Sequence, residues 1–149
     1  MELRTTMSIA QLSQSRDADA ISSGIDPQGT ESHAIAPAVR VLIIDDHHDF
    51  ARSLQQGLEL LGHRTEVAHD APTALLACQT FEPEVALVDI MLPVVDGYDL
   101  GARLRERGVR RLIAVTGTAH SERTIAAGFD AHFGKPLALD ELDRTLRAL

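Results

Sequence analysis

The chain alternates short, fully apolar runs with longer segments in which apolar residues recur every three or four positions. The runs that are apolar at every position lie at 41–44, 85–88 and 112–115. Strands buried on both faces of a parallel sheet have this composition. The mixed segment 64–68 suits one edge of the sheet, and 131–134 is predicted as a fifth strand at the other edge.

Segments with a helical period separate these predicted strands. Between Phe50 and Leu61, apolar residues fall on one helical face. Gly62 follows, a residue that readily takes the left-handed conformation at a helix end. The predicted helices begin near Phe50, Pro72, Gly97, Ser121 and Leu139. Strands that alternate with helices predict an α/β fold, in which helices cover both faces of a parallel sheet.

The first part of the chain lacks these periods. Residues 1–38 are rich in Ser, Ala, Gln and Asp and show no sustained helical or strand pattern, which predicts a disordered N-terminal arm. The whole chain has 149 residues, of which 44% are hydrophobic, enough for one domain with a core but not for two ordinary ones. We therefore expect an arm over 1–38 and a folded domain over 39–149.

Composition limits the setting and the partners. The formal net charge is -8 and the arginines are interspersed, so direct nucleic-acid binding is disfavoured and a protein partner is favoured. No tract approaches the roughly 18 apolar residues that span a bilayer, so we expect no membrane association. The N-terminus lacks the apolar core of a secretory signal and Cys78 is the single cysteine, which favours a reducing, cytoplasmic location.

Acidic residues stand at the ends of two of the apolar runs. Asp45 and Asp46 follow the run 41–44, and Asp89 follows the run 85–88. Taken singly, each could be an ordinary turn or helix-cap residue. Because parallel strands end at the same edge of a sheet, however, we expect the three carboxylates to share one pocket. Such a cluster raises its own pKa values unless a cation lies among them, which predicts a hard, oxygen-seeking divalent metal.

Two further loops are expected to reach the same edge, bringing Thr116 and Lys135. The combination suits phosphoryl transfer to a carboxylate, in which the protein mainly positions groups and neutralises charge. Asp89 would attack phosphorus as the nucleophile. Asp46 would bind the metal directly and Asp45 mostly through water. Thr116 and Lys135 would donate to the remaining phosphoryl oxygens.

The ordered set of motifs resembles a known family. It consists of the Asp45-Asp46 pair, the segment 89–97 with the sequence DIMLPVVDG, Thr116, and Lys135-Pro136. With this set, residues about 40 to 149 resemble the receiver domain of two-component response regulators. The resemblance implies a flavodoxin-like (βα)5 fold, a doubly wound parallel sheet with strand order 2-1-3-4-5.

The resemblance also implies roles for the site. Asp89 is the phosphoacceptor, Met91 supplies a backbone carbonyl to the metal, Mg²⁺ is the usual ion, and the Lys135–Pro136 peptide is cis. The phosphoryl donor is a phosphohistidine of a sensor histidine kinase or of a histidine phosphotransfer protein. Output is expected through an unknown downstream protein. Because the domain phosphorylates and dephosphorylates itself, we expect no enzyme that turns over a separate substrate.

The sequence departs from the family pattern at features that would pass the signal on to a partner. The stretch between Thr116 and Lys135 is about one helical turn shorter than the family's usual fourth helix, at about 3.6 residues per turn. His132 stands where the family often has a Tyr or Phe that swings inward as Thr116 moves toward the phosphoryl group. A histidine there would make the switch sensitive to pH. The chain ends with the last predicted helix, so we expect a single-domain receiver without a DNA-binding module.

The histidines next to the acidic pair raise the alternative of a transition-metal site. His47 and His48 adjoin the acidic pair, but adjacent histidines in a helical turn point apart, so we expect no transition-metal site from this pair. His63 and His69 are expected at the surface.

Two competing functions remain open. The chain could be a constitutive interaction module that keeps the receiver fold without phosphorylation. Alternatively, it could be an aspartate-based phosphatase, in which Asp89 would pass its phosphoryl group to water. Against the phosphatase, no second carboxylate stands two residues after the nucleophile, where the sequence has Met91.

Overall fold

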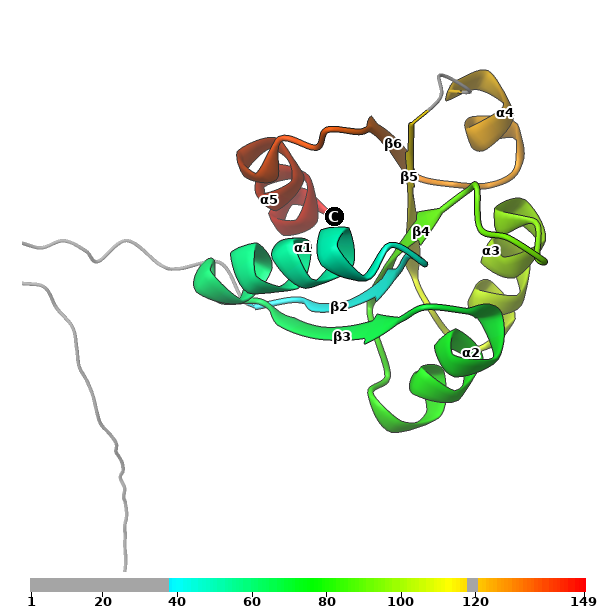
Figure 1. Ribbon diagram of the computed structural model, residues 1–149, viewed down its shortest axis with the longest axis horizontal. Helices are drawn as coiled ribbons and strands as arrows, with labels where there is room; N and C mark the ends of the chain where they lie inside the picture. Colours follow the sequence, from blue (N-terminus) through cyan, green and yellow to red (C-terminus); the bar gives the residue numbers. More distant parts are fainter. Residues whose placement is uncertain (1–37, 118–120) are drawn as a thin grey trace, which may run out of the picture. The chain divides into compact units, whose positions relative to one another are not determined.

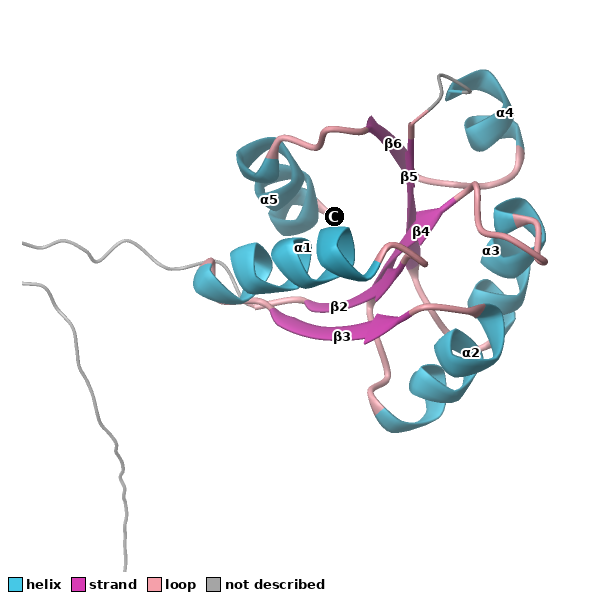
Figure 2. Cartoon of the chain, viewed as in Figure 1, coloured by secondary structure: helices cyan, strands magenta, loops and turns pink. Residues whose placement is uncertain are grey.

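The computed structural model describes residues 38–117 and 121–149, which form a parallel sheet between two layers of helices (Figure 1 and Figure 2). The predicted arm over 1–38 lies almost entirely outside the described residues, so its disorder stays a prediction. In chain order, the elements are β2 (Arg40–Ile44), α1 (His48–Leu60), β3 (Arg64–Ala68), α2 (Ala71–Thr80), β4 (Val85–Asp89), α3 (Gly97–Glu106), β5 (Arg111–Thr116), α4 (Ser121–Ala126), β6 (Ala131–Gly134) and α5 (Leu139–Ala148).

The five strands pair in the order β3-β2-β4-β5-β6, and every pair is parallel. Counted from the first of these strands, this is the predicted order 2-1-3-4-5 and confirms the flavodoxin-like fold. The register aligns Ile44 of β2 with Val88 of β4. The residues that follow these two positions, Asp45 and Asp89, therefore leave the sheet at the same edge.

The side chains of each strand point alternately into two apolar layers. In β2, Val41 and Ile43 belong to the cluster with α1 and α5, whereas Leu42 and Ile44 belong to the cluster with α2 and α3. All four are at most 1% exposed. This burial on both faces is the physical reason for the uninterrupted apolar run, since any polar side chain there would lose its hydration.

Local sequence signals fix several helix ends. Asp70 caps α2 by accepting a hydrogen bond from the backbone N–H of Thr73 at 2.9 Å, and Pro72 occupies the first turn as predicted. Gly62 has a φ of +99°, the left-handed conformation expected after α1. These signals are local, which is why the element boundaries could be predicted closely.

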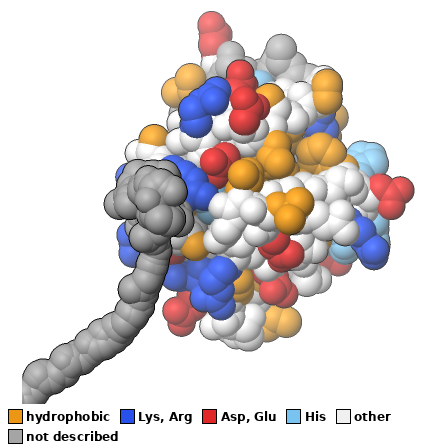
Figure 3. Space-filling model, turned by 90° about the vertical axis from the view of Figure 1, so that its left-hand side faces the viewer, with side chains coloured by type: hydrophobic (Ala, Val, Ile, Leu, Met, Phe, Trp, Pro, Cys, Tyr) orange, Lys and Arg blue, Asp and Glu red, His pale blue; other side chains and the backbone are white. Residues whose placement is uncertain are grey.

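The surface matches the charge pattern of the sequence. On the face shown in Figure 3, acidic and basic side chains are interspersed rather than gathered into one basic stripe. Cys78 is a free cysteine, buried in the core cluster that lies between the sheet and helices α2 and α3. None of the helices in the described part of the chain has the length and apolar character that a membrane crossing requires.

One prediction about a histidine was wrong. His63, expected at the surface, is only 4% exposed. Its Nδ1 accepts a hydrogen bond from the backbone N–H of Val39 at 3.2 Å, and its Nε2 lies 2.7 Å from Oδ1 of Asp143 in α5. That hydrogen bond is the largest of the effects that hold the pKa of the Asp143 carboxyl below its usual value. His69 remains partly exposed, with its ring stacked on that of His48.

Candidate functional site

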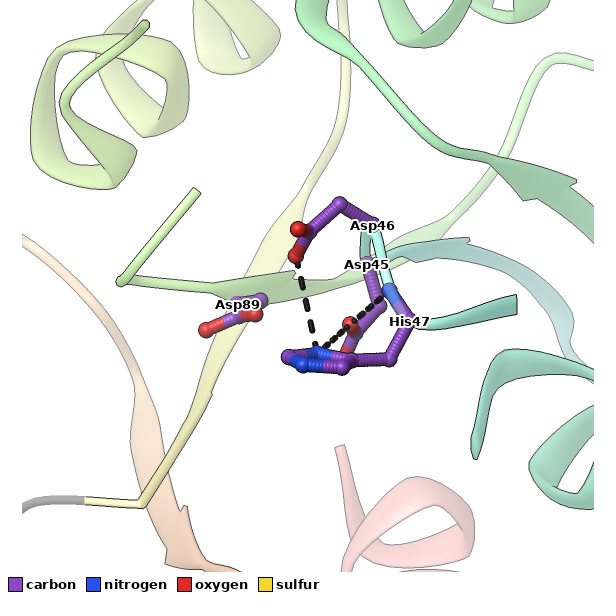
Figure 4. A group of neighbouring side chains, drawn as sticks. All are labelled: Asp45, Asp46, His47 and Asp89. Carbon is purple, nitrogen blue, oxygen red and sulfur yellow. Dashed lines mark hydrogen bonds and ion pairs between the residues drawn. The ribbon is translucent and has the colours of Figure 1, made fainter. Parts of the chain in front are cut away.

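Three acidic side chains converge at the carboxyl edge of the sheet, as predicted. Asp45 and Asp46 directly follow β2, and Asp89 is the last residue of β4 (Figure 4). Asp45 is 1% exposed and Asp89 is 3% exposed. With His47, they offer one ligand atom each within 4.8 Å of one another, a group that could hold a metal ion. The three carboxylates therefore lie close together, and their role as a binding site stays a prediction.

Lys135 brings a positive charge to this cluster from the loop after β6. Its Nζ donates to Oδ2 of Asp45 at 2.8 Å and lies 3.6 Å from Oδ2 of Asp89. The same ammonium lies 4.5 Å from the centre of the Phe50 ring, within the range of a cation–π contact. The Lys135–Pro136 peptide is cis, as the family resemblance implied. The Lys135 ammonium thus contacts two of the three clustered carboxylates, those of Asp45 and Asp89.

The Asp89 carboxylate is oriented from two sides. Its Oδ1 accepts a hydrogen bond from the backbone N–H of Met91 at 2.9 Å, and its Oδ2 faces Lys135. Burial is the main cause that raises the pKa of the Asp89 carboxyl, and the charges of Asp45 and Asp46 raise it further. The Met91 N–H and Lys135 act in the opposite direction. The sequence pattern predicted the repulsion between the carboxylates but not the larger effect of burial.

The carboxylate oxygens of Asp45 and Asp46 differ in their hydrogen-bond partners. Asp45 accepts from Lys135 on Oδ2 and from the backbone N–H of His47 on Oδ1, the latter at 2.8 Å. Oδ1 of Asp46 is buried but has no hydrogen-bond partner among the described residues. A buried carboxylate oxygen without a donor is costly, and a divalent cation would satisfy it. The donor set of carboxylate oxygens fits a hard cation such as Mg²⁺.

The two predicted switch residues lie on neighbouring strands. Thr116 is the last residue of β5 and is fully buried. Its carbonyl oxygen accepts a hydrogen bond from the backbone N–H of Lys135 at 3.0 Å. His132 lies in β6, in register with Ala114. Nε2 of His132 is buried and, among the residues that the structure describes, has no hydrogen-bond partner. The roles of both residues in switching stay predictions, as does the role of the Met91 carbonyl.

His47 was missed as a member of the site. The prediction treated His47 and His48 as a pair, and the two rings do point apart. His48 stacks on His69 with the ring centres 3.7 Å apart, whereas His47 turns toward the acids. The direction of the His47 ring follows from the turn that its own N–H makes with Asp45, which no residue spacing reveals.

The parallel sheet and the acidic cluster at its carboxyl edge define an α/β domain of the receiver type. Residues 41–147 match the family model of the response regulator receiver domain, and the chain belongs to this family. The response regulator MprA of Mycobacterium ulcerans is 34% identical over 116 residues, which cover 75% of this chain and 50% of that protein. The chain thus spans about half the length of the curated relatives it matches.

Solved structures agree with this assignment. The signal receiver domain of a DNA-binding response regulator from Colwellia psychrerythraea is 30% identical, with a TM-score of 0.68 over 74% of this chain and 96% of that one. A response regulator from Burkholderia pseudomallei, solved with a phosphorylated aspartic acid, a calcium ion and citrate, is 28% identical with a TM-score of 0.67, covering 72% of this chain and 66% of that one. Receiver domains typically use Mg²⁺ at their acidic pocket, and are generally not enzymes that act on a separate substrate.

Proposed function

We propose that this receiver accepts a phosphoryl group on Asp89 from a phosphohistidine in a Mg²⁺-dependent phosphorelay. The donor is a sensor histidine kinase or a histidine phosphotransfer protein, and the output is a changed affinity for a downstream protein. One observation carries the proposal: the buried Asp89 carboxylate lies between the Met91 N–H and the Lys135 ammonium, with two further carboxylates beside it. The single cysteine and the family membership favour a cytoplasmic setting.

The chemistry follows from the position of Asp89. A carboxylate oxygen of Asp89 attacks phosphorus, a P–O bond forms, and the P–N bond to the donor imidazole breaks. The bonding electrons leave with the imidazole, and the product is an acyl phosphate on Asp89. The Met91 N–H fixes the direction of the attacking carboxylate, so little orientational freedom has to be lost at the reaction.

Charge neutralisation is the second requirement. The incoming phosphoryl group is negative and meets three carboxylates, so repulsion opposes its approach. Asp46, Asp45 and Asp89 would hold Mg²⁺, with the Met91 carbonyl as a further ligand, and the bound ion would supply positive charge beside the phosphoryl oxygens. Lys135 supplies a second positive charge, and the Thr116 hydroxyl is proposed as a hydrogen-bond donor to the same oxygens.

The output requires a conformational difference that phosphorylation can select. His132 and Thr116 lie on adjacent strands next to the site, and Nε2 of His132 is a buried atom with no hydrogen-bond partner in the described residues. Since an unsatisfied buried nitrogen is unfavourable, the resting position of His132 is easily given up for another. Phosphorylation shifts the population only if the two arrangements bind the phosphoryl group differently.

The proposal is tested by intact-mass measurement. The full chain is incubated with Mg²⁺ and acetyl phosphate, and we expect the mass of one added phosphoryl group, which hydroxylamine removes because it cleaves acyl phosphates. Asp89→Asn should remain unmodified. Asp99→Asn, which changes an exposed carboxylate in the first turn of α3, is the matched control and should be modified like the wild type.

Other outcomes separate the competing functions. If no adduct forms with acetyl phosphate or with any histidine kinase of the source genome, and partner binding is the same for wild type and Asp89→Ala, the chain is a constitutive interaction module. If phosphate is released continuously from small phosphoesters, the chain is a phosphatase. Phosphotransfer profiling against the same set of kinases identifies the donor when the adduct does form.

A further inference from the structure

His47 contributes an imidazole nitrogen to a site otherwise made of carboxylates. It is the residue immediately before α1, and its backbone N–H donates to Oδ1 of Asp45 at 2.8 Å. This turn directs the ring back over the acidic pair (Figure 4). Nδ1 of His47 lies 3.2 Å from Oδ1 of Asp45 and 3.6 Å from Oδ1 of Asp46. The second of these oxygens is the buried one without a hydrogen-bond partner in the described residues.

The two distances from His47 Nδ1 to the aspartate oxygens, 3.2 Å and 3.6 Å, are close to those between ligands of one ion, which would replace the present hydrogen-bond contact with Asp45. Asp45, Asp46, His47 and Asp89 offer one ligand atom each, all within 4.8 Å of one another. Two ligands of a tetrahedral zinc ion, with bonds of about 2.0–2.1 Å, lie roughly 3.3 Å apart. One nitrogen and three oxygens also make up the four donors that such an ion takes. The His47 side chain is 70% exposed, so an ion can reach the group from solvent.

Donor chemistry distinguishes this group from a simple magnesium site. Mg²⁺ is bound through oxygen, whereas imidazole nitrogen favours borderline first-row ions such as Zn²⁺. The neighbouring charges are equally suitable for either ion, because three carboxylates, one ammonium and one dication sum to zero. His47 therefore changes the preference among dications without changing the charge balance.

We propose that His47 is a fourth protein ligand that makes this site bind Zn²⁺ more tightly than Mg²⁺, so that Zn²⁺ competes with Mg²⁺ for the carboxylates around Asp89. The inference rests on the proposed metal site and adds its selectivity. His48 takes no part, because its ring stacks on His69 instead of facing the acids.

The test measures Zn²⁺ and Mg²⁺ binding to the full chain by calorimetry. We expect His47→Gln to weaken Zn²⁺ binding by about tenfold or more, since even the loss of a residue that only supports a ligand costs 10- to 100-fold. Mg²⁺ affinity should be unchanged in this variant. His48→Gln is the matched control, a neighbouring histidine outside the ligand group, and should bind both ions like the wild type.

A spectroscopic measurement identifies the ligating atom. In nitrogen-15 spectra of the histidine rings, the Nδ1 resonance of His47 should shift on addition of Zn²⁺ but not of Mg²⁺, and excess Mg²⁺ should reverse the shift by competition. This measurement requires no phosphorylation, and it separates the site from Zn²⁺ bound by histidines elsewhere in the chain. Backbone amide spectra of each variant verify that the fold is retained.

The outcomes separate this proposal from the metal site on which it rests. If His47→Gln binds Zn²⁺ as tightly as the wild type, or if the His47 Nδ1 resonance does not move, the proposal is wrong while the magnesium site stands. Asp46→Asn should weaken both ions. If it weakens neither, the carboxylates hold no metal at all, and the proposed Mg²⁺ dependence fails as well.

Discussion

The two edges of the same sheet handle charge in opposite ways. At the carboxyl edge, Asp45 and Asp89 are almost fully buried and share a single close ammonium, that of Lys135. At the amino edge, a cavity of about 550 Å³ is lined by arginines and glutamates, and Arg40 pairs with Glu84 at 2.9 Å with about a third of each side chain exposed. The cavity at the amino edge therefore has nearly balanced, partly hydrated charges, whereas the acidic cluster at the carboxyl edge has an excess of negative charge.

This difference supports the carboxyl edge as the proposed site of phosphorylation. Exposed pairs of opposite charge contribute little in either direction, so they require no explanation beyond solubility. Buried carboxylates that repel one another lower the stability of the fold, and a sequence that places them together accepts this cost for another purpose. A search by cavity volume alone would select the amino edge of the sheet, away from the acidic cluster.

The largest effect is expected from Lys135→Met. The variant keeps the aliphatic stem and removes the ammonium that faces Asp89, so the phosphoryl oxygens lose a fixed positive charge. We expect the initial rate of phosphorylation by acetyl phosphate to fall by about 100-fold or more, the usual cost of losing one such donor. The rate is followed by intact mass at saturating Mg²⁺. A rate close to that of the wild type would show that Lys135 is only a structural partner of Asp45.

The second effect compares one substitution at the two edges. A Cβ on Gly97 would lie 2.7 Å from the Ile90 Cα and 3.1 Å from the Asp89 carbonyl oxygen, which are backbone atoms that cannot easily move. Gly97→Ala should therefore lower the free energy of unfolding by about 2 kcal/mol. Gly108, at the amino edge, has open space but a φ of +101°, so Gly108→Ala should cost only about 1 kcal/mol. Urea denaturation measures both, and equal costs would contradict the comparison.

The third effect is a gain in stability. Because the folded state raises the pKa of Asp89 above its ordinary value of 3.8, the ionised wild type is penalised at neutral pH. Asp89→Asn should therefore raise the free energy of unfolding at about pH 7, by on the order of 1 kcal/mol. The stability of the wild type falls as the pH rises through the raised folded pKa, so the advantage of the variant should vanish below pH 3.8. Denaturation curves at several pH values, recorded without Mg²⁺, test this; an advantage independent of pH would contradict it.

The smallest effect is expected at the amino edge. Arg40→Gln removes the partly exposed ion pair with Glu84 and the hydrogen bond that Arg40 Nε donates to the Glu82 carbonyl oxygen, and we expect a loss of only about 0.5 kcal/mol. Phosphorylation by acetyl phosphate should proceed at the wild-type rate, because the pair lies at the opposite edge of the sheet from Asp89. Urea denaturation and intact mass measure the two quantities. A slowed phosphorylation would show that the two edges are coupled.

Sequence predicted the sheet and the acidic positions well because both have local signals. A strand buried on both faces must be apolar at every position, and the residue after such a strand lies at a known edge. The burial of His63 had no such signal, since its partner Asp143 is 80 positions away in the chain. The direction of the His47 ring depends on a hydrogen bond to Asp45 that only the folded turn defines. The pattern of apolar and polar residues alone predicts neither contacts between distant residues nor the direction of a side chain.

The short helix α4 has a consequence for motion. It is only six residues long, and among residues 122–126 only Thr124 is buried, while Ile125 is 67% exposed. A helix of this length is marginal by itself, so it depends on contacts such as the stacking of Arg123 on Tyr98, 4.4 Å from the ring centre. We therefore expect its amide protons to exchange with solvent through local opening, at a free energy well below that of unfolding the sheet. A protein that binds over α4 could therefore change its conformation without disturbing the sheet.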